Sequence, residues 1–152
     1  MRVFASALIA ATASAGAAVY GSTVCVSNLA GFDLHWWMQD LNSGYLSADS
    51  TSYPIDKTKC MSVAMYGLKD GDFIETYIHA DGGVTQMVDS AVIYQSSPAI
   101  TVSYTCTGAT LTYSCKLNGE AYLSELANAG MLEDIPVFAK ALGLEDQTAI
   151  YQ

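Results

Sequence analysis

The chain has 152 residues, of which 51% are apolar and 14% are charged. This length suits one domain with its own core, and so little charge argues against a long disordered segment or a coiled coil. The net charge is −9 with only six Lys and Arg residues, which argues against nucleic-acid binding because that requires clustered positive charge.

The N-terminal residues have the organisation of a secretory signal peptide. Arg2 supplies a positive start, residues 3–12 are apolar, and residues 13–15 (Ala-Ser-Ala) form a small-residue cleavage site. We expect residues 1–15 to be removed, and the sequence also permits cleavage as late as residue 18. The alternative, an uncleaved anchor, is disfavoured because the stretch is short and rich in small side chains. The sequence therefore predicts a secreted, extracellular protein whose mature chain has no transmembrane segment.

The four cysteines favour disulfides over a metal site. In an oxidising compartment an even set of cysteines usually forms crosslinks. The chain has no CxxC pair and only two histidines, which leaves a poor ligand set for zinc. We therefore expect two disulfides, no metal and no cofactor. The cysteines are Cys25, Cys60, Cys106 and Cys115.

Apolar and polar residues alternate with a period of two through the middle of the chain, which predicts β-strands. Between the expected strands, residues 42–57 are rich in Ser, Asp and Thr and indicate a loop with one short strand at 44–47. A hairpin turn is expected at residues 81–83 (Asp-Gly-Gly). The expected strands cover residues 23–27, 32–39, 59–66, 73–80, 84–94 and the two halves of 100–117.

Residues 100–117 indicate a hairpin with a defined register. If residues 108–109 (Gly-Ala) form a two-residue type II′ turn, Tyr104 lies opposite Tyr113 and every apolar residue faces another apolar residue. A one-residue slip would destroy this match, because it moves each side chain to the other face of the sheet.

That register has a consequence for the disulfides. It separates Cys106 from Cys115 by about 13 Å along one face, whereas a disulfide needs Cα atoms within roughly 7 Å. Either the hairpin is bulged, or each of these cysteines pairs with Cys25 or Cys60. Cys25 and Cys60 both lie on the small, polar sides of their strands, which slightly favours the pairing Cys25–Cys60 with Cys106–Cys115.

The spacing of apolar residues becomes helical after residue 119. Two short helices are predicted, the first ending at Gly130 and the second capped by Asp134. We therefore predict a mainly β fold, in which residues 16–119 form an antiparallel β-sandwich or barrel of six to eight strands. Residues 120–152 form a C-terminal pair of α-helices packed on the same domain.

Nucleophile, phosphate-loop and metalloprotease motifs are absent from the sequence. Two expected strands nevertheless each carry a carboxylate, an aromatic ring and an imidazole at alternate positions, which point the same way. If these strands pair, the residues form an outward patch that could stack on sugars or anchor a protein partner. The plainer alternative is that the C-terminal helices cover this face. The candidate ligand-binding residues are Asp33, His35, Trp37, Glu75, Tyr77 and His79.

The sequence favours a secreted, disulfide-stabilised, non-catalytic β-rich module. Such a module would bind an extracellular protein or glycan, or form part of a coat or matrix. One alternative is a carbohydrate-binding or hydrolytic protein that uses the predicted patch. A second alternative is a secreted membrane-active effector or toxin.

Overall fold

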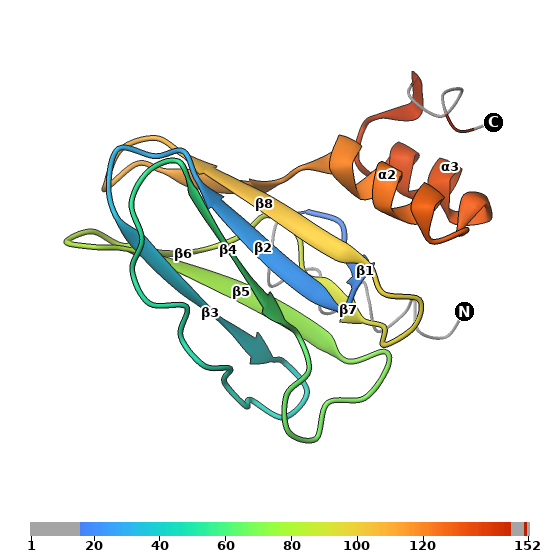
Figure 1. The fold of residues 1–152 in the computed structure, drawn as a ribbon, viewed down its shortest axis with the longest axis horizontal. Helices are drawn as coiled ribbons and strands as arrows, with labels where there is room; N and C mark the ends of the chain where they lie inside the picture. The colour runs from blue at the N-terminus through green and yellow to red at the C-terminus, as the bar shows by residue number, and fades with distance from the viewer. Residues whose placement is uncertain (1–15, 147–150, 152) are drawn as a thin grey trace.

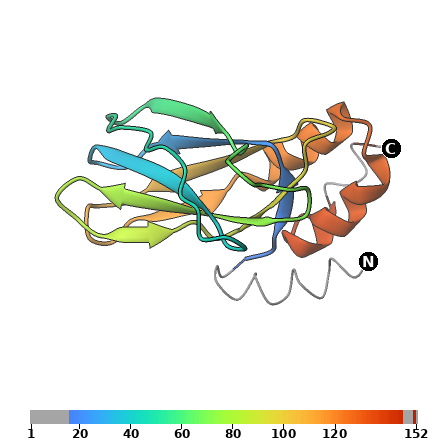
Figure 2. The ribbon, with the colours of Figure 1, turned by 90° about the horizontal axis from the view of Figure 1, so that it is seen from below.

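The computed structural model describes residues 16–146 and residue 151 (Figure 1). The signal peptide predicted for residues 1–15 lies outside the described residues. Within them, nine strands form two sheets and two short α-helices follow. Figure 2 shows the strands in two layers with the helices at one end. The predicted mainly β fold with a C-terminal helical pair is confirmed, and its architecture is an open sandwich, not a closed barrel.

Each sheet combines strands from distant parts of the chain. The first has the order β1 (Val19–Gly21), β7 (Val92–Tyr94), β5 (Phe73–Ala80) and β3 (Leu34–Asp40), and β6 (Thr85–Met87) also pairs with β5. The second has the order β4 (Lys57–Ser62), β2 (Thr23–Asn28), β8 (Thr101–Thr107) and β9 (Ser114–Leu117).

Both sheets are mixed. Five of the seven strand pairs in the described residues are antiparallel, in keeping with the predicted antiparallel sandwich, and one pair in each sheet is parallel. Strand β1 runs parallel to β7, and β2 runs parallel to β8. Alternation along a strand determines which side chains share a face, but it carries no information about the direction of the neighbouring strand. Strand direction was therefore decided by which distant segment docks beside β1 and β2.

The core lies between the two sheets and follows the predicted alternation. In β3 every second residue is buried, beginning with Leu34, and Trp36 is fully buried. Ile78 of β5 lies beside it in the register, and Tyr104 of β8 contributes from the other sheet. The hydroxyl of Tyr104 donates a hydrogen bond to the Ser90 carbonyl, so this buried polar group is satisfied.

The β8–β9 hairpin differs from the predicted register. Cys106 lies opposite Cys115, and residues 108–113 separate the strands in place of a two-residue turn. The slip is by an even number of residues, so each side chain keeps its predicted face. The Tyr113 hydroxyl donates to two backbone carbonyls of the β5–β6 hairpin, at 2.9 and 2.6 Å. A contact with the other sheet therefore holds this loop, and local pairing rules could not reveal it.

Both disulfides join directly opposed residues of neighbouring strands. Cys25–Cys60 links β2 to β4 and Cys106–Cys115 links β8 to β9, with Cα–Cα distances of 4.0 Å in each. The favoured pairing is confirmed. Cys106 and Cys115 are buried in the core, whereas Cys60 is exposed, so one bridge crosslinks the core and the other the outside of the second sheet.

The C-terminal elements are α2 (Gly119–Asn128), the 3-10 helix η1 (Leu132–Asp134) and α3 (Ile135–Ala141). Asn118 caps α2 by accepting a hydrogen bond from a backbone N–H of its first turn. Gly130 follows the end of α2 with φ of +78°, as a terminating glycine should. Asp134 occupies the N-cap position of α3, although its side chain makes no capping hydrogen bond.

The helices pack on one end of the sandwich. Phe138 of α3 makes edge contacts with Tyr20 of β1 and Tyr122 of α2, and the Tyr122 hydroxyl donates to the Tyr20 carbonyl. Figure 1 shows both helices beyond the start of β8 and away from β3. The outer face of β3 and the middle of β5 are therefore left uncovered by the helices. In the described part of the chain, neither helix has the length and apolar character needed to cross a bilayer.

Candidate functional site

The pairing of β3 with β5 brings together residues from the two predicted strand faces. His35 lies opposite His79, and Trp37 lies opposite Tyr77. These four side chains point to the outer face of the first sheet and are partly exposed, while their neighbours in sequence point into the core. The pairing on which the predicted patch depended is therefore present.

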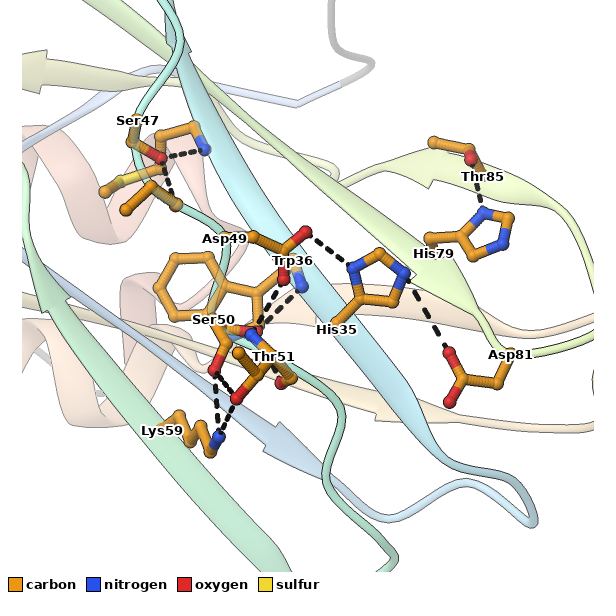
Figure 3. Close-up of polar contacts among 12 residues, drawn as sticks. His35, Trp36, Ser47, Asp49, Ser50, Thr51, Lys59, His79, Asp81 and Thr85 are labelled. Atoms are coloured by element: carbon orange, nitrogen blue, oxygen red, sulfur yellow. Dashed lines mark hydrogen bonds and ion pairs between the residues drawn. The ribbon is translucent and has the colours of Figure 1, made fainter.

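An irregular segment, residues 45–53, lies along the free edge of β3, and we call it the strap. Its backbone N–H groups donate to three alternate carbonyls of β3. The hydroxyls of Ser47 and Ser50 accept hydrogen bonds from the N–H groups of Met38 and Trp36, at 2.8 and 2.9 Å. Figure 3 shows these contacts between the strap and β3, with Asp49 between the two serines. The strap protects an edge strand from pairing with another chain and fixes Asp49 beside β3.

His35 is held between two carboxylates. Its Nδ1 lies 2.7 Å from Asp49 Oδ2, and its Nε2 lies 3.9 Å from Asp81 Oδ1 (Figure 3). A carboxylate at the shorter distance accepts the Nδ1 hydrogen, which leaves Nε2 facing Asp81. The three side chains are 25%, 45% and 41% exposed, so they form a surface group and not a buried ion pair.

The second histidine and the aromatic pair extend this surface. His79 Nδ1 lies 2.7 Å from the Thr85 hydroxyl, and the two imidazole rings are 5.2 Å apart. The rings of Trp37 and Tyr77 are stacked, with centroids 6.0 Å apart and planes inclined by 19°. Together these four rings form a continuous strip over two neighbouring strands.

The Tyr77 hydroxyl acts as a hydrogen-bond donor within the strip. Burial, and after it the negative charge of Glu75, raise the pKa of Tyr77 above its ordinary value of 10.0. The phenol therefore keeps its proton at neutral pH and donates to Gln39 Oε1 at 3.2 Å.

Two of the six predicted residues lie apart from the exposed strip. Asp33 precedes β3, and its backbone carbonyl accepts a hydrogen bond from the Asp81 N–H at 2.9 Å. Glu75 shares the outer face of β5 but is fully buried. The carboxylates next to His35 are Asp49 and Asp81, which the sequence reasoning missed. Asp81 lies in the predicted Asp-Gly-Gly turn, whereas no periodic signal placed the strap beside β3.

A shallow groove begins at Tyr77 and runs between β6 and β9. Its volume is about 560 Å³, and Met87, Val88 and Lys116 are among the residues that line it. The groove extends the strip towards the second sheet. Within residues 16–146 and 151, no three His, Cys, Asp or Glu side chains are placed to hold a metal ion. The arrangement therefore offers stacking surfaces and hydrogen-bonding groups.

Comparison with known proteins does not assign the chain to a family. No family model and no curated protein matches it. Similar solved structures are pneumolysin (TM-score 0.37, 9% identity), a structure described as "Trapped Toxin" (0.36, 11%) and listeriolysin O (0.36, 13%). Each similarity covers 64% of this chain but only 22–23% of the other protein. The chain thus spans less than a quarter of their length, and likeness at this level carries no argument about activity.

Proposed function

We propose that the protein is a secreted, disulfide-stabilised and non-catalytic module that binds an extracellular ligand. Its ligand surface is centred on His35, Trp37, Tyr77 and His79. The two disulfides support an oxidising destination, because such crosslinks persist outside the cytosol. The outer face of β3 and β5 supports the binding role.

The observation that carries this proposal is the stacked pair of Trp37 and Tyr77 on a face that the helices leave open. Partly exposed aromatic rings beside hydrogen-bonding groups are typical of binding hot spots, because a ligand can bury the rings while it satisfies the polar groups. Trp36, the immediate neighbour of Trp37, already serves the core. Trp37 points the other way, so its ring belongs to the outer face of the sheet and not to the core between the sheets.

A glycan is the ligand class that this surface favours. Sugar rings stack on aromatic faces, and their hydroxyls can donate to the exposed carboxylates of Asp49 and Asp81 and to the amide of Gln39. Glycoside hydrolysis fits less well, since that reaction needs two carboxyl groups on either side of the scissile bond. Here the imidazole of His35 lies between the two carboxylates.

Binding of the purified protein to immobilised polysaccharides and glycan arrays tests the proposal. We expect Trp37→Ala to abolish binding while circular dichroism and the melting temperature show a retained fold. Val137→Ala is the matched control, because Val137 is 57% exposed on α3 and lies outside the strip. Unchanged binding by Trp37→Ala would overturn the assignment of the surface. Loss of a captured protein partner, in place of a glycan, would keep the surface and change the ligand class.

Two alternatives differ in a measurable way. Concentration-dependent self-association without any external ligand would favour a coat or matrix component. Leakage of dye from liposomes in the presence of the pure protein would favour a membrane-active effector.

A further inference from the structure

The exposed tyrosines of the protein lie together at the end of the sandwich opposite His35 and His79. All ten tyrosines lie within the described residues, and only Tyr45 and Tyr66 have exposed side chains, 49% and 83% respectively. They belong to different loops, yet their ring centroids are only 6.1 Å apart. The two most accessible phenols of the chain are therefore neighbours.

The backbone presents both rings at sharp turns. Gly44 precedes Tyr45 and Gly67 follows Tyr66, with φ values of +80° and +76° that favour glycine. Open space surrounds the position where a Cβ would stand at either glycine. Both glycine positions are therefore uncrowded, and the exposure of the two tyrosines gives a reactant access to their rings.

Little restrains the two side chains. Residues 41–48 and 61–68, which flank the two tyrosines, contain no charged residue. Among the described residues, the structure shows no hydrogen bond to the hydroxyl of Tyr45 or Tyr66. Exposed side chains of this kind change rotamer on the picosecond to nanosecond timescale. Rings with centroids 6.1 Å apart are already within the range of aromatic contact, so side-chain rotation alone can bring their edges together.

The other tyrosines lack this freedom. Tyr53, Tyr104, Tyr113 and Tyr122 are buried, and each donates its hydroxyl to a backbone carbonyl. Tyr77 donates to Gln39, and the remaining tyrosines are partly buried. Accessibility and proximity therefore single out one pair.

We infer that Tyr45 and Tyr66 of one chain form an oxidative crosslinking site that yields dityrosine. The oxidant is hydrogen peroxide, used by an extracellular peroxidase. Each phenol gives up one electron and one proton, and the two ring radicals join through a bond between their ortho carbons. The ortho hydrogens then move to the oxygens, which restores both phenols. The peroxide takes up the two electrons and two protons and leaves as two molecules of water.

This inference rests on the extracellular location included in the proposed function, but not on the ligand surface. The crosslink would tie the loop after β3 to the loop before β5. By restricting the unfolded chain, such a bridge stabilises the end of the sandwich that lacks a disulfide between these loops. The crosslinking site and the ligand surface can therefore be tested separately, because neither depends on the other.

The test treats dilute protein with hydrogen peroxide and a peroxidase. We expect dityrosine fluorescence, a product that stays monomeric on a reducing gel, and an intact mass lower by two hydrogens. Peptide mapping should join the segment with Tyr45 to the segment with Tyr66. Tyr66→Phe and Tyr45→Phe should each reduce the monomeric crosslink to background. Tyr94→Phe is the matched control and should leave the yield unchanged, since Tyr94 is partly buried.

Other products would overturn the inference. These are a crosslink that persists in Tyr66→Phe, oligomers as the main product in dilute solution, or oxygen added to Met65 with no linked peptide. Glycan binding should be the same in wild type and Tyr66→Phe. Failure of the crosslink and failure of the ligand surface can therefore be told apart.

Discussion

The two ends of the β3–β5 pair carry surfaces of opposite character. At the start of β3 and the end of β5, His35 and His79 face each other beside Asp49 and Asp81. At the other end, segments 41–48 and 61–68 lie in or beside the loops after β3 and before β5 and contain no charged residue. Tyr45 of the first segment contacts Tyr66 of the second. One ladder of strand pairs therefore supports a polar, ordered surface and an uncharged, accessible one.

The difference lies in how the side chains are held. The histidine end depends on cross-strand register and short hydrogen bonds of 2.7 Å, which fix ring orientation as recognition requires. The tyrosine end depends on glycine turns and on Asp40, whose carboxyl group accepts from the Asn42 N–H and the Ser43 hydroxyl. Fixed groups suit selective binding, whereas rings that can turn suit a reaction between them.

The largest expected effect is unfolding of the whole sandwich at alkaline pH, which removes both surfaces together. Burial raises the pKa of Tyr122, and burial with the charges of Glu75 and Asp89 raises the pKa of Tyr104. The folded state therefore holds phenolic protons that the unfolded chain releases near pH 10. Stability is intact below about pH 10 and falls as the pH rises further. Circular dichroism against pH should show one cooperative transition.

Tyr122→Phe tests how much one of these phenols contributes to the alkaline transition. It removes the hydroxyl's hydrogen bond to the Tyr20 carbonyl and lowers stability at neutral pH by about 1 kcal/mol. It should also flatten the decline above pH 10, because one titrating group has gone. A decline as steep as in the wild-type protein would contradict the role of this phenol.

Asp40→Ala should loosen the tyrosine end alone. Asp40 is 1% exposed, and loss of its two hydrogen bonds to the loop should lower the free energy of unfolding by about 2 kcal/mol. Denaturant unfolding measures this change. The yield of dityrosine should fall with it, because the loop no longer holds Tyr45 close to Tyr66, although each ring can still turn. Asp40→Asn, which keeps one acceptor oxygen, should lose less. Equal losses in glycan binding would show that the two ends are not independent.

Tyr113→Phe is the corresponding change at the histidine end. It removes the hydroxyl that ties the β8–β9 loop to the carbonyls of Ile78 and Val84, and we expect a loss of about 1 to 2 kcal/mol. Because His79 and Asp81 belong to the tethered hairpin, ligand affinity should fall in a binding titration. Dityrosine formation should be unaffected, and a fall in its yield would show that the two ends are not independent.

Asp49→Ala should have the smallest effect on stability. The pair with His35 is at the surface, where such contacts contribute up to about 1 kcal/mol. Thermal unfolding should therefore change little, while ligand affinity decreases because His35 loses its orienting partner. Asp49→Asn retains an acceptor oxygen and should bind better than Asp49→Ala. The opposite order of affinities would exclude an orienting role.

Particular residues show which features of the fold were predictable from the sequence. The alternation predicted that Trp37 faces outward, and it does, while its neighbour Trp36 lies in the core. The same logic favoured the pairing Cys25–Cys60, because both residues lie on the polar sides of their strands. The register of β8 with β9 was wrong, since a two-residue turn satisfied the local pattern but took no account of Tyr113 reaching the other sheet.

The partners of His35 were outside the reach of the sequence. Asp49 approaches through the strap, whose Ser-rich sequence has no periodicity and whose hydrogen bonds are made to the edge of β3. Glu75 had the same spacing as Tyr77 and His79, yet it is buried and they are not. Spacing determines the face of a strand, whereas burial depends on what lies over that face.

The sequence by itself determined the strand faces and the two short helices, because these follow from local periodicity and side-chain direction. It favoured one cysteine pairing, which the structure then decided. Only the tertiary structure decided that the sheets are mixed, that His35 meets Asp49 and Asp81, and that Tyr45 touches Tyr66. These contacts join segments far apart in the chain. Their geometry depends on how whole sheets and loops pack, and no local pattern encodes that packing.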